Sequence, residues 1–306
     1  MEINSVYLKQ NENESLYKLM AMRRLYSNAK FINKITFVFS VIVPVLISLA
    51  KIFASRYEFV NNKEFIPYLG YYGIAVLLFT IVTGGMVTEL KRKAAKIQEM
   101  FDCYVLSIKW NDVKVGKKVS SLDIHKSSRY FRKKKAKTIF ENWYFKEEYE
   151  FDKNAAALLC QNENIGWDLS QRIILNRILL SILSLSALLL IGYGFYCDMK
   201  ISEFLFYIVF LLPFFRHFYL QLKDNKSTIE RCIRVNEIIE KNIDSYLADK
   251  KEDERDVEYI IRSIQDEIYS HRVSNQPVPD MIHKCFRSKN EEQFKQHFDC
   301  YFEKFK

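Results

Sequence analysis

The residues best suited to chemistry lie between positions 129 and 143, where cations and aromatic side chains stand close together. This cluster comprises Arg129, Tyr130, Arg132, Lys133, Lys134 and, further on, Trp143. Guanidinium and ammonium groups bind phosphate oxygens, and aromatic rings stack on nucleobases. The cluster therefore predicts a nucleotide-binding site, with its four cations on phosphates and Tyr130 or Trp143 against a base. A second interpretation stays open, because a basic segment beside a membrane also contacts anionic lipid headgroups.

Catalytic signatures are absent from the sequence. It contains no P-loop, no G-x-S-x-G, no H-E-x-x-H and no dinucleotide fingerprint. The five histidines share no ligand spacing, and the six cysteines include no C-x-x-C pair. The acidic residues between 244 and 258 are typical of a solvated helix face. We expect a protein that is not an enzyme, without catalytic residues, metal ligands or a cofactor.

Four apolar runs must position the basic cluster. They cover about residues 35–54, 65–87, 173–196 and 203–222, and each is close to the roughly 20 residues that a helix needs to cross a bilayer. Only 8 Gly and 5 Pro in 306 residues favour long helices. The apolar spacing continues past the second run to about residue 106 and past the fourth to residue 247. The predicted fold is all-α, with four transmembrane helices and helical stalks that extend into a mostly α-helical cytoplasmic region.

The distribution of Lys and Arg predicts the orientation. Residues 88–172 hold 18 of them, residues 1–34 hold 6 and residues 221–306 hold 16, whereas the two short loops hold only Arg56, Lys63 and Lys200. Positive residues gather on the cytoplasmic side. We therefore expect a multi-pass protein with both termini in the cytoplasm. Its predicted parts are an N-terminal amphipathic helix (1–34), hairpin 1 (35–87), a central segment (88–172), hairpin 2 (173–222) and a C-terminal helical region (223–306).

Outside the spans, further elements follow from the spacing of apolar residues. We expect helices at about 15–33, 122–140, 154–164, 257–272 and 281–303, and an irregular segment at 109–121. Within the spans, four small hydroxyl side chains could line a pore or mediate helix packing: Thr80, Thr83, Ser181 and Ser184. Four helices enclose too little space for a pore, so a pore requires a homo-oligomer.

Three stretches together carry a resemblance to a known family. Near the N-terminus they are Gln10-Asn11, Leu16, Leu19, Ala21, Arg24-Leu25-Tyr26 and Ala29-Lys30. In the central segment they are Phe101-Asp102, Val105, Trp110-Asn111, Gly116-Lys117, Trp143-Tyr144, Cys160-Gln161, Asn164 and Trp167-Asp168. In the tail they are Ile264-Gln265-Asp266, Ile268-Tyr269, Arg272 and Pro277-Val278-Pro279-Asp280. In order and spacing they resemble the SMODS-associating four-transmembrane effector family of bacterial anti-phage systems.

The resemblance implies a role in cyclic-oligonucleotide-based (CBASS-type) defence. It implies an effector in the bacterial inner membrane that binds a cyclic oligonucleotide made by a partner nucleotidyltransferase. Binding would make it oligomerise or open, disrupt the membrane and cause abortive infection. The resemblance implies the cyclic nucleotide as the activating ligand, and we expect no direct DNA or RNA binding. The alternative is a non-enzymatic membrane scaffold that recruits a cytosolic protein.

Ten residues of these motifs need not take part in ligand binding. They could be structural, fixing how the N-terminus, the central segment and the tail pack together. They are Arg24, Tyr26, Trp110, Asn111, Gln161, Trp167, Asp168, Gln265, Asp266 and Arg272.

Overall fold

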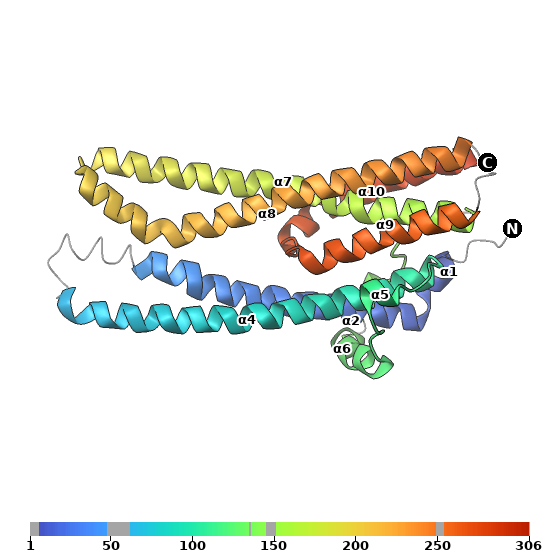
Figure 1. The fold of residues 1–306 in the computed structure, drawn as a ribbon, viewed down its shortest axis with the longest axis horizontal. Coiled ribbons are helices and arrows are strands. Elements are labelled where there is room, and N and C mark those ends of the chain that lie inside the picture. Colours follow the sequence, from blue (N-terminus) through green and yellow to red (C-terminus); the bar gives the residue numbers. More distant parts are fainter. Residues whose placement is uncertain (1–5, 48–61, 135, 145–150, 249–253, 306) are drawn as a thin grey trace. The chain divides into compact units, whose positions relative to one another are not determined.

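The computed structural model describes residues 6–47, 62–134, 136–144, 151–248 and 254–305, and no β-strand occurs within these ranges. The all-α fold predicted from the sequence is therefore confirmed (Figure 1). In chain order the elements are α1 (Val6–Asn11), α2 (Asn13–Phe37), the π-helical turn η1 (Val38–Ile42), α4 (Asn62–Val105), α5 (Asp112–Val115), α6 (Ser121–Lys133), the short 3₁₀ helix η2 (Lys137–Ile139), α7 (Lys153–Tyr196), α8 (Ile201–Ala248), α9 (Glu254–Ser274) and α10 (Asp280–Phe305).

The long helices follow the apolar period that predicted them. α4 has 44 residues and ends one residue before the predicted position 106, and α8 has 48 residues and continues to Ala248. Two shorter elements differ from expectation. α6 ends at Lys133 instead of Phe140. The segment predicted to be irregular contains α5, because the Asn111 side chain accepts hydrogen bonds from the first backbone N–H groups of that helix.

The chain folds into two compact units. The first contains residues 1–28, 89–174 and 227–306, and the second contains residues 29–88 and 175–226. Three helical stretches are long and apolar enough to cross a membrane: Asn13–Ile47, Tyr71–Val105 and Lys153–Tyr196. The fourth predicted span lies within α8, which is not among these three, and residues 48–54 of the first predicted span lie outside the described residues.

The second unit exposes large apolar side chains along its helices. Leu78 is 59% exposed and Leu188 is 66% exposed, and at most 11% of the residues in the apolar stretches of the three candidate spans are buried. Apolar area on this scale is unfavourable in water and favourable in lipid. The exposed helices therefore identify an all-α membrane protein.

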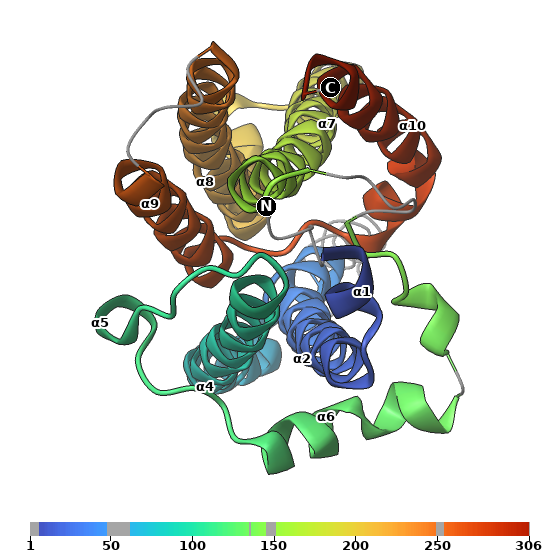
Figure 2. The same ribbon diagram turned by 90° about the vertical axis from the view of Figure 1, so that its right-hand side faces the viewer.

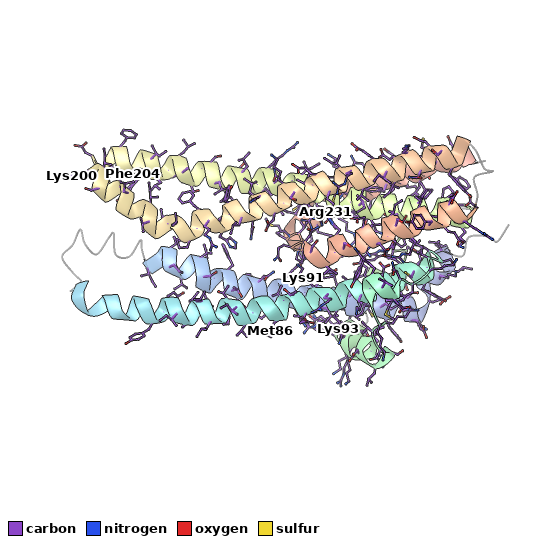
Figure 3. The ribbon with its side chains drawn as sticks, viewed as in Figure 1. Met86, Lys91, Lys93, Lys200, Phe204 and Arg231 are labelled. Carbon is purple, nitrogen blue, oxygen red and sulfur yellow. The ribbon has the colours of Figure 1, made fainter. Side chains whose placement is uncertain are left out.

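Close polar and steric contacts join the helices of this second unit. The Thr36 hydroxyl lies 3.0 Å from that of Thr83, linking α2 to α4. The Tyr72 hydroxyl donates to the Phe39 carbonyl, which belongs to the π-helical turn. Phe204 lies where α7 turns into α8 (Figure 3). Its ring packs on Gly194 so closely that an added Cβ would lie 2.9 Å from a ring carbon.

The first unit has a large hydrophobic core. Its most buried side chains come from five helices, and each is at most 1% exposed: Leu19 of α2, Phe101 of α4, Leu158 of α7, Ile239 of α8 and Ile268 of α9. Burying one such side chain contributes about 1.5–3 kcal/mol. Segments far apart in the sequence therefore hold one another in place.

Helix α6 lies across α2 and α4 within the first unit (Figure 2). The Ser120 hydroxyl accepts from the Asp123 backbone N–H and so caps the helix. Ile124 and Ser128 form its buried face, and Asp123 pairs with Lys93 of α4 at 3.4 Å. These contacts leave the basic face of α6 outward.

Candidate functional site

Helix α6 and the residue after it carry the predicted cationic cluster. Arg129, Lys133 and Lys134 are exposed. Arg132 is half-buried, donates to the His125 carbonyl at 3.0 Å, and lies with its guanidinium carbon 5.1 Å from the centre of the Tyr17 ring. Three exposed cations and one anchored guanidinium therefore lie within six consecutive residues, and each can donate to phosphate oxygens.

Tyr130 on the surface of α6 has two cations over its ring. The Arg24 guanidinium lies 4.3 Å from its ring centre, and the Lys134 ammonium lies 4.5 Å from it. The Lys134 ammonium, helped by Arg24, lowers the pKa of the Tyr130 phenol. The ring is 39% exposed, so a planar ligand can reach it and stack on it by displacing one of the two cations.

A cavity of about 320 Å³ opens beside this surface. It is lined by Asn13, Leu16, Tyr17, Met20, Arg132, Ala136 and Lys137. The Arg132 Nε is buried and has no hydrogen-bond partner among the described residues. The cavity thus combines an aromatic ring, an apolar floor and two cations, which suits one nucleotide unit.

Trp143, the other predicted stacking residue, lies elsewhere in the first unit. Its half-buried ring meets Phe101 edge-on, with ring centres 6.4 Å apart. Its indole therefore contributes to the core, whereas Tyr17, which the sequence did not single out, lines the cavity.

A buried polar network lies in the interior of the same unit. Its centre is Gln265 of α9, whose amide nitrogen donates to Glu99 at 2.8 Å and to Asp102 at 3.1 Å, both on α4. Gln161 of α7 donates to the Gln265 side chain at 3.1 Å and to the Ile261 carbonyl at 2.9 Å. All four polar side chains are 0% exposed, so the network links three helices away from water.

Arg272 extends this network. Its guanidinium donates to Asp102 and, at 3.1 Å, to Asn164. The Tyr144 hydroxyl donates to Asp102 at 2.7 Å and accepts from Asn164 at 2.8 Å. Burial alone would lower the pKa of Arg272, but the Asp102 carboxylate outweighs burial and raises it above its ordinary value. Burial raises the pKa of Tyr144, so this phenol stays protonated.

Three further motif residues are Asp266, Asn111 and Trp110, and Arg262, which lies outside the motifs, links Asp266 to Glu99. Arg262 pairs with Glu99 at 2.7 Å and with Asp266 at 2.8 Å. Asn111 donates to Asp266 at 2.7 Å while capping α5. The Trp110 indole donates to the Gly116 carbonyl at 3.1 Å. The Trp110-Asn111 motif thus holds the loop around α5 and joins it to α9.

The remaining motif residues lie on α2 and α7. Tyr26 packs against the core of the first unit. Trp167 stacks on Phe294 of α10, with ring centres 6.1 Å apart. Asp168 pairs with Arg172 and lies 2.6 Å from His271 Nε2.

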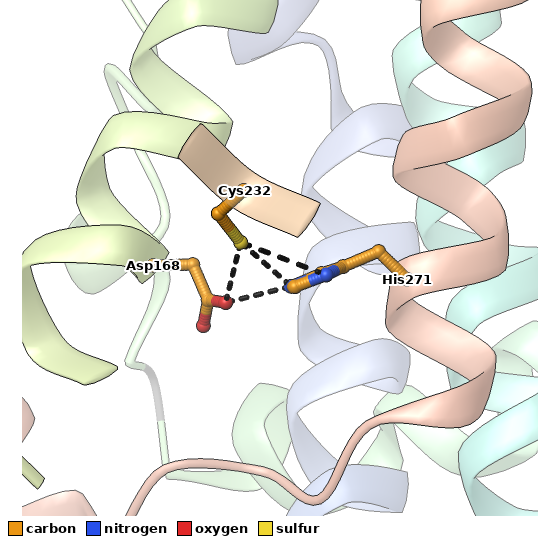
Figure 4. Close-up of side chains that lie close together, drawn as sticks. All are labelled: Asp168, Cys232 and His271. Atoms are coloured by element: carbon orange, nitrogen blue, oxygen red, sulfur yellow. Dashed lines mark hydrogen bonds and ion pairs between the residues drawn. The ribbon is translucent and has the colours of Figure 1, made fainter. Parts of the chain in front are cut away.

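The Asp168–His271 pair is part of a group of three side chains from three helices (Figure 4). Cys232 of α8 joins Asp168 and His271, and the three ligand-type atoms lie within 4.8 Å of one another. Burial raises the pKa of the Cys232 thiol to about 12. Sequence spacing could not reveal this group, because its members stand 64 and 39 positions apart on different helices.

The four hydroxyl residues suggested for a pore all lie in the second unit. Thr83 is buried and contacts Thr36. Thr80, Ser181 and Ser184 are exposed, and the Thr80 hydroxyl donates to the Val76 carbonyl of its own helix. Thr83 therefore mediates helix packing in this chain, and the other three remain accessible.

Comparison with known proteins gives two findings. The model of the family described as "SMODS-associating 4TM effector domain" matches residues 4–300. A protein of Bacillus cereus (strain VD146), named "Probable CBASS effector molecule", is 29% identical over 210 residues, which cover 67% of each chain. No solved structure matches the sequence.

Proposed function

Because the chain belongs to the SMODS-associating 4TM effector family, we propose that it is a membrane effector of anti-phage defence that is switched on by a cyclic oligonucleotide. In this proposal the ligand binds the surface of α6, and the protein then oligomerises or opens and disrupts the membrane, causing abortive infection. The observation that carries the proposal is the cavity lined by Tyr17, Arg132 and Lys137 beside the exposed cations of α6. The bacterial relative named as a CBASS effector supports the same assignment.

The chemistry of this surface matches the chemistry of the ligand. A cyclic oligonucleotide presents one negative phosphate for each planar base. Arg129, Lys133 and Lys134 are exposed and able to bind phosphate oxygens, and Tyr17 or Tyr130 offers a ring to a base. The cavity of about 320 Å³ is at the small end of ligand pockets. It therefore suits one nucleotide unit, with the rest of the ligand on the open surface or on a second copy of the chain.

A route from ligand to membrane follows from the helices that α6 contacts. Arg132 lies on the Tyr17 ring of α2, and Asp123 pairs with Lys93 of α4. Both α2 and α4 belong to stretches apolar enough to cross a membrane. A ligand that favours one arrangement of these helices shifts the population toward it. A change from 1:99 to 99:1 needs about 5.5 kcal/mol of differential binding, which several charge-assisted hydrogen bonds can supply.

The proposal includes four spans in the bacterial inner membrane and a cytoplasmic location for both termini. The excess of Lys and Arg in residues 1–34, 88–172 and 221–306 supports this orientation. A cytoplasmic first unit would place α6 in the compartment where a nucleotidyltransferase releases its product.

The test measures ligand binding and membrane leakage on the full chain in liposomes, with a panel of cyclic di- and trinucleotides. We expect one ligand to bind and to release an entrapped dye. The double variant R129E/K133E should abolish both while leaving membrane insertion unchanged. A matched control is R234E/K241E, which reverses two exposed charges on α8 and should behave as wild type.

Two results would count against the proposal. If R129E/K133E binds the ligand as tightly as wild type does, the site on α6 is wrong. If no member of the panel causes leakage and no oligomer forms, the effector mechanism is wrong, and the membrane scaffold becomes the better explanation.

A further inference from the structure

The group formed by Asp168, Cys232 and His271 has the composition of a metal centre. Asp168 comes from α7, Cys232 from α8 and His271 from α9, and their side chains point toward one another (Figure 4). Cys232 is 0% exposed and His271 is 6% exposed. We propose that these three residues bind a zinc ion. This site is independent of the nucleotide site on α6.

The three side chains offer ligand atoms that suit zinc. A thiolate sulfur, an imidazole nitrogen and a carboxylate oxygen are the three ligand types that zinc takes in proteins, at about 2.0–2.3 Å. Three protein ligands leave a fourth position for water or for the second Asp168 oxygen. Cys232 and His271 are buried, whereas the Asp168 side chain is 27% exposed, so an ion can enter the group on the Asp168 side.

The distances show what binding requires. Two ligand atoms on one tetrahedral zinc ion are about 3.4–3.6 Å apart, given those bond lengths. Cys232 Sγ lies 4.0 Å from Asp168 Oδ2 and 3.9 Å from His271 Nε2, and Nε2 lies 2.6 Å from that same oxygen. The oxygen and nitrogen must separate by about 0.8 Å as the ion takes the place of the proton between them.

The thiol must also turn toward Nε2. Cys232 Sγ is 3.8 Å from His271 Nδ1 and 3.9 Å from Nε2, so it favours neither nitrogen. Sγ is only about 0.3–0.6 Å farther from Nε2 and from the Asp168 oxygen than a shared zinc ion requires, so a small rotation of the thiol brings it onto an ion held by Nε2. The same equal spacing argues against a Cys–His nucleophile pair, in which the sulfur would point at one nitrogen.

The surroundings of His271 can complete the site. The Asn275 amide nitrogen lies 2.6 Å from His271 Nδ1, and the Thr228 hydroxyl lies 3.0 Å from the Asn275 oxygen. When an ion occupies Nε2, the imidazole proton moves to Nδ1 and needs an acceptor. A flip of the Asn275 amide supplies its oxygen, with Thr228 then accepting from the amide nitrogen. Such outer hydrogen bonds orient metal-bound histidines.

With zinc bound, the group keeps one net positive charge, which comes from Arg172. Arg172 pairs with Asp168 and donates to the Gln276 carbonyl at 3.1 Å, so one positive charge is already present. Zinc binding displaces the proton of the Cys232 thiol to solvent and leaves a thiolate. The thiolate and the Asp168 carboxylate together carry two negative charges, which offset the ion.

Cobalt substitution tests the site on the full chain in detergent. Metal is first removed with a chelator, and Co²⁺ or Zn²⁺ is then added. We expect one ion per chain, a thiolate-to-cobalt charge-transfer band, and a higher thermal midpoint with zinc. The variant C232S should lose the band. The matched control C160S replaces another fully buried cysteine of the same unit and should keep it.

A conservative variant keeps the test decisive if C232S fails to fold. N275A leaves all three ligands in place and should lower the affinity for Co²⁺ by about 10- to 100-fold. The proposal is overturned if wild type binds no cobalt, if the band survives in C232S, or if N275A binds as tightly as wild type does. An absence of cobalt binding would identify the group as a hydrogen-bonded packing cluster, and a band that survives in C232S would assign the metal to another cysteine.

Discussion

The Arg272 guanidinium donates to the Asp102 carboxylate deep inside the first unit, where the two side chains are 9% and 0% exposed. The pair joins α9 to α4 across 170 positions of sequence. Asn164 accepts from the same guanidinium, and Tyr144 and Gln265 donate to the carboxylate. A buried ion pair satisfied in this way does little for net stability, yet removing one member leaves an uncompensated charge.

Replacing Arg272 with Met should therefore lower the free energy of unfolding by about 3–5 kcal/mol. The tryptophans Trp110, Trp143 and Trp167 all belong to the first unit, so their fluorescence during denaturation reports its unfolding. The control R287M removes an exposed pair with Glu291 and should cost at most about 1 kcal/mol. Equal losses of unfolding free energy in R272M and R287M would mean that the buried pair matters no more for stability than the exposed one.

The hydrogen bonds of Glu258 predict that the stability of the protein depends on pH. Its carboxylate accepts from Lys153 at 2.8 Å and from Lys109 at 3.2 Å, and these hydrogen bonds lower its pKa below 4.5. A carboxylate with a lowered pKa stabilises the fold at neutral pH, and this contribution is lost as the pH falls through the lowered value. The difference in thermal midpoint between wild type and E258Q should therefore be positive at pH 7 and shrink as the pH falls below 4.5.

The exposed Glu267 of the same helix offers a control for this experiment. The difference in thermal midpoint between wild type and E267Q should vary less with pH, because Glu267 forms no ion pair with any residue that the structure describes. A constant difference between wild type and E258Q from pH 7 to pH 3 would contradict the assignment.

Gly166 makes a steric prediction. A Cβ there would lie 2.7 Å from the Phe294 ring, which stacks on Trp167. Alanine normally stabilises a helix interior relative to glycine, but G166A should instead destabilise the protein by about 1–3 kcal/mol through overpacking. Denaturation of G166A, F294A and the double variant provides the measurement. If the added Cβ clashes with the Phe294 ring, G166A should lower the free energy of unfolding by less in the F294A background than in wild type.

The sequence predicted the long helices well because the apolar spacing that indicates them can be seen between residues three or four positions apart. An apolar residue at every third or fourth position continues from the second apolar run to Val105, and α4 follows it to that residue. α6 was predicted seven residues too long. Its backbone leaves the helix at Lys134, in a run of adjacent cations where like charges oppose a further turn. α5 has four residues, which is too short for any period to show.

The interior network was only partly visible in the sequence. The motif order singled out Asp102, Gln161, Gln265 and Arg272, which the fold brings into one network. It gave no reason to choose Glu99 or Arg262, which complete the same network. Spacing detects partners within a few turns of one helix, whereas these residues meet across 163 positions. The predicted cations of α6 were adjacent in sequence and so remained together, while Trp143 faces the core instead.

Tyr130 gives the sharpest test of the nucleotide site. Cations of Arg24 and Lys134 lie over its ring, which is 39% exposed, so a base that stacks on it takes the place of one of these cations. Stacking on an aromatic ring contributes about 1–3 kcal/mol per base. Y130A should therefore weaken binding of the activating cyclic nucleotide by about 5- to 150-fold, measured by titration calorimetry on the full chain.

Tyr259 of α9 is 75% exposed and serves as the control, because Y259A removes a tyrosine from another helix. Y130F keeps the ring and should bind within about twofold of wild type, since stacking needs the ring and not the hydroxyl. If Y130A and Y259A bind equally well, the base does not stack on Tyr130, and Tyr17 in the adjoining cavity becomes the residue to test.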